Sequence, residues 1–186
     1  QVEWVVTIYL LVLSGLLLSF GRLGDLRGHK MVYNTGFAIF LVSSALCGLA
    51  PSVNALIVFR AIQAIGAAML SANSPAILTK SFPSRQRGQA LGLQATMTYL
   101  GLTVGPSLGG WVSEQFSWRA VFYINVPVIL IALFLSIRFI PSDKPEKQTE
   151  QFDLKGALVF MAGLVALLFA LNQGHAMGWT SPVILG

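Results

Sequence analysis

Charged residues are scarce in this sequence. Asp, Glu, Lys and Arg make up 10% of its 186 residues and hydrophobic residues 55%, whereas a soluble domain is about 25% charged. This composition excludes a soluble globular core. The single cysteine, Cys47, excludes an internal disulfide. The net charge of +5 does not indicate nucleic-acid binding, because the basic residues are segregated along the chain.

Catalytic and cofactor-binding motifs are also absent. No GxxxxGK[ST] sequence marks an ATP site, and no Ser/His/Asp or metal-ligand cluster occurs. The two histidines, His29 and His175, lie in predicted loops at opposite sides and cannot share a metal. No Asp or Glu lies within an apolar run, although proton-driven transporters usually need one. We therefore predict no enzyme, no metal site and no bound cofactor.

Long uncharged runs dominate what is present. Crossing a bilayer takes about 20 mainly apolar residues, and the runs predict six helices in an all-α integral membrane fold. Their predicted bounds are Trp4–Phe20, Met31–Ala50, Asn54–Thr79, Ala90–Val112, Ala120–Ile140 and Gly156–Leu171. The sequence starts without Met, shows no signal peptide and ends in a new apolar run. We therefore expect a piece of a longer protein.

The basic residues alternate between the predicted connections. Ten of the twelve Lys and Arg residues fall in connections on one side of the membrane. Arg119 lies on the other side, and Arg60 lies inside a span. The positive-inside rule places the basic side in the cytoplasm. We therefore predict a multi-pass protein of the cytoplasmic (inner) membrane, with the lipid bilayer as its surroundings.

Arg60 is the one charge well inside a predicted span. It lies six residues after Asn54, so about 9 Å deep along a helix. A charge at that depth is costly and usually faces a cavity or a partner. Gln63 lies on the same helix face, which favours a polar relay lining a cavity. The alternative is an arginine that snorkels to the outer headgroups.

A basic, glycine-rich stretch joins the first two predicted helices. We interpret Gly21–Lys30 as a tight cytoplasmic turn, in which glycines permit sharp bends and close approach of helices. Asp25, the only acid there, can pair with a helix N-terminus or an arginine and form a latch that breaks when domains rock. An ordinary topology signal with turn residues explains the stretch equally well. The predicted latch residues are Gly21, Gly24, Asp25, Arg27, Gly28 and Lys30.

A glycine ladder marks the fourth predicted helix. Gly101, Gly105 and Gly109 recur every four residues and share one face, with Gly110 beside them. Such a stripe lets another helix come close, and Pro106 can bend the helix. The ladder thus predicts a tight, bendable interface. Static packing explains it equally well.

These three stretches together resemble motifs of the major facilitator superfamily, and within it the fourteen-span drug:proton antiporters. The turn matches the signature between spans two and three, although Leu26 stands where a basic residue is usual and His29 where arginine is usual. Leu56–Ala68 resembles the fourth-span motif, with Ala64 in place of a usual glycine. Gly101–Gly110 resembles the fifth-span antiporter motif. The stretches Trp118–Pro127 and Phe152–Gly156 resemble the fourteen-span group in particular.

The resemblance implies where this chain belongs in a transporter. It places residues 1–140 in the N-terminal bundle as spans two to six, 141–155 in a cytoplasmic linker without chemistry of its own, and 156–186 in an additional span and the start of the next. The acids that such transporters use for coupling lie outside these spans. The resemblance therefore implies that this piece alone does not transport.

The resemblance also implies a function. The complete protein would be a multidrug efflux transporter that exchanges cationic or amphipathic drugs for protons by alternating access, with the proton gradient as energy source and Arg60 in proton transfer. The resemblance leaves open whether a periplasmic adaptor protein binds the transporter. The alternatives are a dedicated exporter of a metabolite, siderophore or lipid precursor, and a membrane fragment that does not transport.

Overall fold

The computed structural model describes residues 2–143, and beyond them residues 155–156, 159–160, 162–164, 166–167 and 170. Residues 2–143 form five long helices. A short 3-10 turn, η1 (Ser84–Gln86), lies between the third and the fourth of them. This part of the chain contains no strand, so the predicted all-α fold is confirmed. The long helices are α1 (Val2–Arg27), α2 (His29–Leu49), α3 (Val53–Ser81), α4 (Arg87–Gln115) and α5 (Trp118–Phe139).

Serine caps begin two of these helices. The hydroxyl of Ser52 accepts a hydrogen bond from the Ala55 N–H of α3 at 3.2 Å, and that of Ser117 accepts one from the Arg119 N–H of α5 at 3.3 Å. Each cap satisfies a backbone donor that the first helical turn leaves free. By contrast, α2 follows Gly28 and has no cap from its own N-terminus.

The predicted tight turn over Gly21–Lys30 is wrong in extent. α1 continues through Gly21 and Gly24 to Arg27, and α2 begins at His29. The whole reversal is made at Gly28, whose φ of 94° lies in the left-handed region that glycine enters without a steric penalty. One glycine in that conformation is enough to end a helix, so the other two remain helical.

Four of the five helices are long and apolar enough to cross a membrane: α1 from Trp4, α2, α3 and α5. α4, which contains the predicted span Ala90–Val112, is a 29-residue helix but is not among them. Its glycines, glutamines, threonines and serines lower its mean hydropathy. The sixth predicted helix, Gly156–Leu171, lies mostly outside the described residues.

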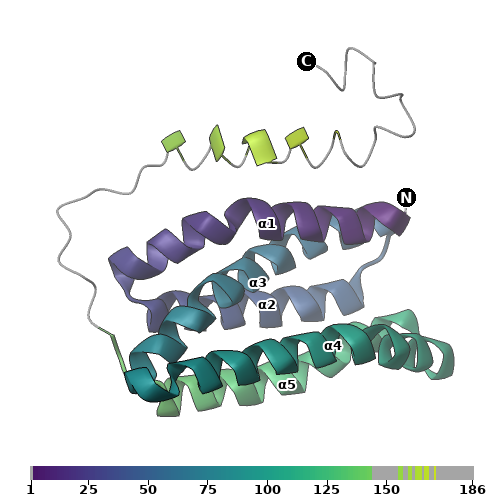
Figure 1. Ribbon diagram of the computed structural model, residues 1–186. Coiled ribbons are helices and arrows are strands. Elements are labelled where there is room, and N and C mark those ends of the chain that lie inside the picture. Colours follow the sequence, from purple (N-terminus) through teal and green to yellow (C-terminus); the bar gives the residue numbers. More distant parts are fainter. Residues whose placement is uncertain are drawn as a thin grey trace.

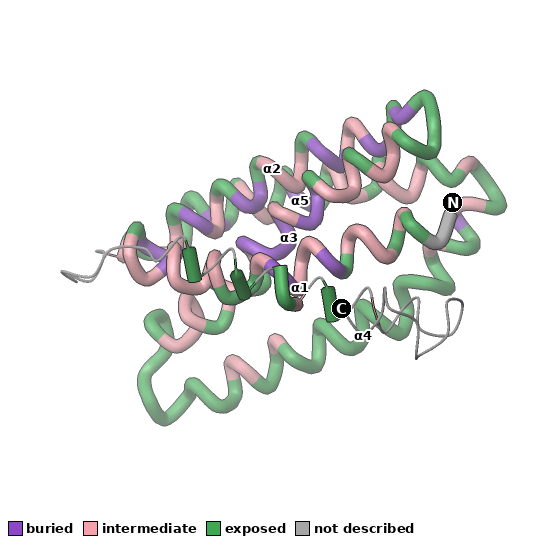
Figure 2. The backbone as a smooth tube through the Cα atoms, turned by 90° about the horizontal axis from the view of Figure 1, so that it is seen from above, coloured by how far each residue is buried: buried purple, intermediate pink, exposed green. Residues whose placement is uncertain are grey.

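The packing centres on α2 and α3. α2 contacts α1, α3 and α5, and α3 also contacts α1 (Figure 1). α4 contacts α5 and α3 more sparsely, and Figure 2 shows it exposed along most of its length. In α4, Val112 is the one buried residue. The tight core of the described chain is therefore formed without α4.

Small residues bring α2 and α3 close together. A Cβ added at Gly66 of α3 would lie 2.8 Å from the Gly36 carbonyl oxygen and 2.8 Å from the Phe40 nitrogen of α2. Ala64 and Ala68 beside it are fully buried. Backbone approach of this kind is how helices gain packing energy in a bilayer, where apolar side chains have no hydrophobic preference for each other over lipid.

Candidate functional site

Arg60 lies in the second turn of α3, where three helices meet. Its Nη1 donates a hydrogen bond to Gln63 Oε1 at 2.8 Å, and its Nε donates to the Val5 carbonyl of α1 at 3.4 Å. The guanidinium carbon lies 4.1 Å from the centre of the Tyr9 ring of α1 and 5.9 Å from that of Phe122 in α5. Aromatic faces stabilise a cation most strongly where water is scarce.

Gln63 extends this contact into the core. Its side chain is 1% exposed, and its Nε2 donates to Ser44 Oγ of α2 at 2.7 Å. Ser44, fully buried, in turn donates to the Phe40 carbonyl at 2.6 Å. Gln63 and Ser44, both buried polar side chains, therefore each have hydrogen-bond partners, as burial in an apolar surrounding requires.

This Arg60 network is a fixed positive charge with oriented neighbours. The guanidinium is half-buried and has five N–H donors, of which Nη1 and Nε make the two hydrogen bonds to Gln63 and Val5. An arginine keeps its proton at any physiological pH, so it acts by holding charge rather than by releasing a proton.

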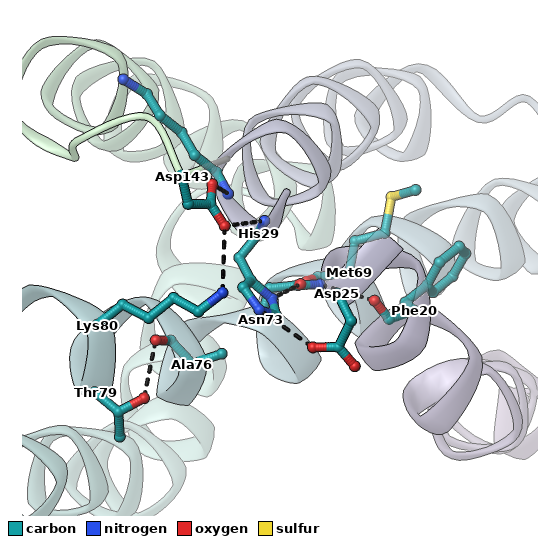
Figure 3. A network of polar contacts seen from close by, with 10 residues as sticks. Phe20, Asp25, His29, Met69, Asn73, Ala76, Thr79, Lys80 and Asp143 are labelled. Carbon is teal, nitrogen blue, oxygen red and sulfur yellow. Dashed lines mark hydrogen bonds and ion pairs between the residues drawn. The ribbon is translucent and has the colours of Figure 1, made fainter. Parts of the chain in front are cut away.

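A second cluster joins the helices at the basic end of the bundle, which we define by the ends of α1, α3 and α5 and the start of α2. His29, 3% exposed, opens α2. Its Nδ1 lies 2.8 Å from Asn73 Oδ1 of α3, and its Nε2 lies 3.4 Å from Asp25 Oδ1 of α1. Asn73 is fully buried. Figure 3 shows these side chains converging from three helices.

Asp143, just after α5, supplies the cap that α2 lacks. Its carboxylate accepts hydrogen bonds from the His29 N–H at 2.6 Å and the Lys30 N–H at 3.1 Å, and it lies 3.8 Å from Lys80 Nζ (Figure 3). Partial burial raises the pKa of Asp143, but these N–H donors and the nearby His29 outweigh it and hold that pKa below its usual range.

Lys30 completes an exchange of caps between the same two helices. Its Nζ donates to the carbonyls of Ile137 at 3.1 Å and Ile140 at 2.5 Å, at the end of α5. An ammonium there satisfies carbonyls that have no intrahelical partner and opposes the negative end of the helix dipole. The start of α2 and the end of α5 are thus fastened by one cap in each direction.

The other predicted latch residues have different surroundings. A Cβ at Gly24 would lie 1.8 Å from Asn73 Oδ1, so this glycine admits the asparagine of α3. A Cβ at Gly21 would meet nothing within 4 Å. Arg27 ends α1 and is exposed. The cluster therefore contains part of the predicted set, while Gly21 and Arg27 stand apart from it.

The glycine ladder of α4 faces open space in the described structure. A Cβ at Gly101, Gly105, Gly109 or Gly110 would meet nothing within 4 Å. α4 continues unbroken through Pro106. The helix that the ladder is predicted to contact is thus not among the described residues, and the interface stays a prediction.

Sequence reasoning missed several residues of these two sites, among them Tyr9, Ser44, Asn73 and Asp143. It also placed His29 in a loop, which is wrong, because His29 is the buried first residue of α2. Tyr9 and Ser44 lie in apolar runs and carry no spacing signal that links them to Arg60. Asn73 is an amide within a span, and a polar residue there is itself a signal of a buried contact. Asp143 was assigned to a linker without chemistry, because no local pattern reveals a cap 114 residues away in sequence.

Comparison with known proteins agrees with this helical membrane architecture. The family model of the Major Facilitator Superfamily matches residues 1–186. The chain is 38% identical over 173 residues to the riboflavin transporter RibZ of Clostridioides difficile (strain 630), covering 93% of this chain and 38% of that protein. It is 36% identical over 180 residues to the multidrug resistance protein Stp of Mycobacterium tuberculosis (strain ATCC 25618 / H37Rv), covering 96% and 33%.

A third relative is the multidrug transporter protein MdtP of Bacillus subtilis (strain 168), 35% identical over 187 residues, which cover 100% of this chain and 34% of that protein. The chain therefore belongs to the Major Facilitator Superfamily, which confirms the resemblance inferred from its motifs. It spans 33% to 38% of the length of these three curated relatives.

Proposed function

We propose that the complete transporter containing this chain exports small cationic or amphipathic compounds in exchange for protons, by alternating access. The multidrug names of two relatives support drugs as substrates. In the proposed orientation the protein lies in the inner membrane, with its basic end in the cytoplasm. In this scheme the midplane site lies between two helix bundles, one of which contains this chain.

The observation that carries the proposal is the Arg60 network. A charged side chain in a span is costly and is kept there for a functional reason. Here Arg60 is held by Gln63, Val5 and the Tyr9 ring, so its position is defined before any solute arrives. We propose that it sets the electrostatic potential of the cavity and that Gln63 and Ser44 keep it aligned as the bundles move.

The test is ethidium efflux from cells expressing the complete transporter, with and without a protonophore. We expect efflux that the protonophore stops. Arg60→Ala should reduce this efflux to the empty-vector rate at unchanged expression, because the charge and its alignment are both lost. The matched control is Arg138→Ala, which removes an exposed arginine at the basic end of α5 and should leave efflux within about twofold of the unsubstituted rate, since surface changes are mostly mild.

Arg60→Lys separates charge from geometry. Lysine keeps the charge but cannot reproduce the two-donor contact, so partial efflux would assign part of the role to charge alone. Efflux at the full rate in Arg60→Ala would contradict the proposed role of the network. Efflux that is insensitive to the protonophore would contradict proton exchange.

A second candidate is a dedicated exporter of one metabolite. The relative in Clostridioides difficile is named a riboflavin transporter, so a flavin or a similarly flat, polar aromatic solute is a specific alternative. Cells expressing the transporter would then release riboflavin faster than vector controls, while ethidium efflux would stay at background. The two results together decide between the candidates.

A further inference from the structure

His29 is buried at the junction of three helices, with a hydrogen-bonding group on each side of its ring. It is 3% exposed and directly follows the reversal at Gly28. Asn73 of α3 lies at its Nδ1, and Asp25 of α1 lies at its Nε2 (Figure 3). What the ring can do therefore depends on which of its nitrogens carry protons.

The orientation of Asn73 decides the first nitrogen. Its Nδ2 donates to two backbone carbonyls, that of Phe20 in α1 at 3.1 Å and that of Met69 in α3 at 2.9 Å. Turning the amide around would set its oxygen against both carbonyls, so this orientation is fixed. Its Oδ1 can only accept. His29 Nδ1, 2.8 Å away, must therefore carry a proton and donate it.

The second nitrogen then has two states. With Nδ1 protonated, a neutral ring leaves a lone pair on Nε2, which faces the Asp25 carboxylate at 3.4 Å. The lone pair and the carboxylate are both acceptors, so they form no hydrogen bond with each other. A second proton on Nε2 turns the same contact into a charge-assisted hydrogen bond between an imidazolium and a carboxylate. The contact between α1 and α2 at this point thus depends on one proton.

We propose that His29 Nε2 is a proton-binding site at the basic end of the bundle. The bound proton fastens Asp25 of α1 to the start of α2, while Asn73 holds the same ring to α3. When the proton leaves, the Asp25 carboxylate is released. An arginine at this position would make the contact permanent, whereas a histidine makes it depend on the bound proton.

The other charged groups around the ring come from three helices and from the segment after α5. Asp25 faces it from α1, and Asp143 lies beside it after α5, held by the His29 backbone N–H. Lys80 of α3 pairs with Asp143 at 3.8 Å. Lys30, next in α2, directs its ammonium to the end of α5. Asp25 is therefore the carboxylate at the ring itself, while Asp143 contacts the His29 backbone and both lysines are engaged elsewhere.

The test is a double-mutant cycle on the complete transporter in detergent, measured by thermal unfolding at about pH 6 and about pH 8, on either side of the usual range for histidine. Asp25→Asn should lower Tm by roughly 1 °C at the lower pH and by less than half of that at the higher pH. The sign follows from charge: the ion pair exists only with the proton bound, so its contribution is present in acid and lost as pH rises.

Two backgrounds serve as controls. With His29→Gln, Asp25→Asn should have the same small effect at both pH values, because no proton can bind. With His29→Arg, the effect should be large at both, because the charge is permanent. An equal effect of Asp25→Asn at both pH values in the unsubstituted transporter would overturn the proposal. These measurements do not involve transport, so they stand or fall separately from the proposed efflux.

A measurement without substitutions covers the case in which a variant does not fold. Exchange of the imidazole carbon-bound hydrogen for deuterium depends on ring protonation and can be followed by mass spectrometry of the peptide that holds His29. We expect its rate to change in one step between about pH 5 and about pH 8. A rate that shows no step in this interval would mean that the ring does not change protonation, and would overturn the proposal.

Discussion

Gly66 illustrates how single residues decide the packing of this bundle. Its missing side chain lets the α2 backbone pass, with the Gly36 carbonyl and the Phe40 nitrogen where a Cβ would lie. Backbone atoms cannot rotate away as a side chain can, so any larger residue must move a helix. The buried alanines on the same face repeat the principle.

Gly66→Ala should lower the free energy of unfolding by about 1–3 kcal/mol, because α2 and α3 must separate. The matched control is Gly92→Ala in α4, where an added Cβ meets nothing within 4 Å. The control should be neutral or more stable by up to about 1 kcal/mol, since alanine is the better helix former. Unfolding in a denaturing detergent measures both. Equal stability of the two variants would contradict the packing argument.

The same scale separates the two polar sites. Arg60 keeps its charge at any physiological pH, so its network is fixed. His29 can gain or lose one proton at Nε2, so its cluster has two states in our proposal. Both sites are satisfied by amides in α3, Gln63 and Asn73, which are each at most 1% exposed. Buried amides that bond in several directions hold their neighbours in one arrangement.

At the scale of elements, the ends of helices carry the long-range connections at the basic end. α2 has no cap of its own, and α5 ends without a glycine stop at Ile140. Asp143, after α5, caps the start of α2, and Lys30 of α2 caps the end of α5. Each helix end thereby holds the other in place, which fixes where the chain leaves the bundle after α5.

Asp143→Asn should cost about 1 kcal/mol of stability, because a neutral amide is a weaker partner for the N–H groups of His29 and Lys30. Faster amide hydrogen exchange at these two positions would show that the effect is local. Ser142→Ala, which alters an exposed neighbour, is the control and should change neither quantity. Unchanged exchange at the start of α2 in Asp143→Asn would contradict the capping role.

The pH dependence of this cap is opposite in sign to that of His29. The pKa of Asp143 is held below its usual range, so the cap contributes fully above the ordinary carboxyl range. Its contribution is lost as the pH falls through the lowered pKa. Between mildly acidic and neutral pH the cap stays constant, whereas the His29 contact is gained on acidification. A scan across both ranges separates the two.

At the scale of the whole molecule, α4 stands apart. It contacts α3 and α5 only sparsely and is exposed along most of its length (Figure 2). Val112 alone is buried in it, and an added Cβ on its glycine face would meet nothing within 4 Å. The chain spans about a third of the length of several relatives. A helix with a bare glycine face fits a bundle whose further helices lie outside the described segment.

Gly105→Leu should therefore stop transport by the complete protein while leaving the packing among α1, α2, α3 and α5 intact. A leucine adds bulk on the face where we predict another helix to approach. Thr103→Leu adds similar bulk on a different face of α4, where Thr103 is exposed and its hydroxyl donates to Tyr99 within the helix. Efflux measures both variants. Transport at the normal rate in Gly105→Leu would contradict the predicted interface.

The sequence by itself determined the membrane surroundings, the presence of the five described long helices and the family. Apolar runs have the length of a bilayer crossing, and helix formation in such runs depends on backbone hydrogen bonds that are local along the chain. The spacing of Arg60 and Gln63 predicted a shared face for the same reason. The turn was predicted too long because the sequence shows at which glycines the chain can reverse direction, whereas the reversal needs only one of them.

The tertiary structure alone decided the partners. Asp143 reaches α2 across 114 residues, and Asn73 reaches His29 across 44. Contacts at such separations depend on how helices cross, and no local pattern along the chain encodes the crossing. The small residues of α2 and α3 permit close approach. Only the packed bundle shows which polar groups that approach brings within hydrogen-bond distance.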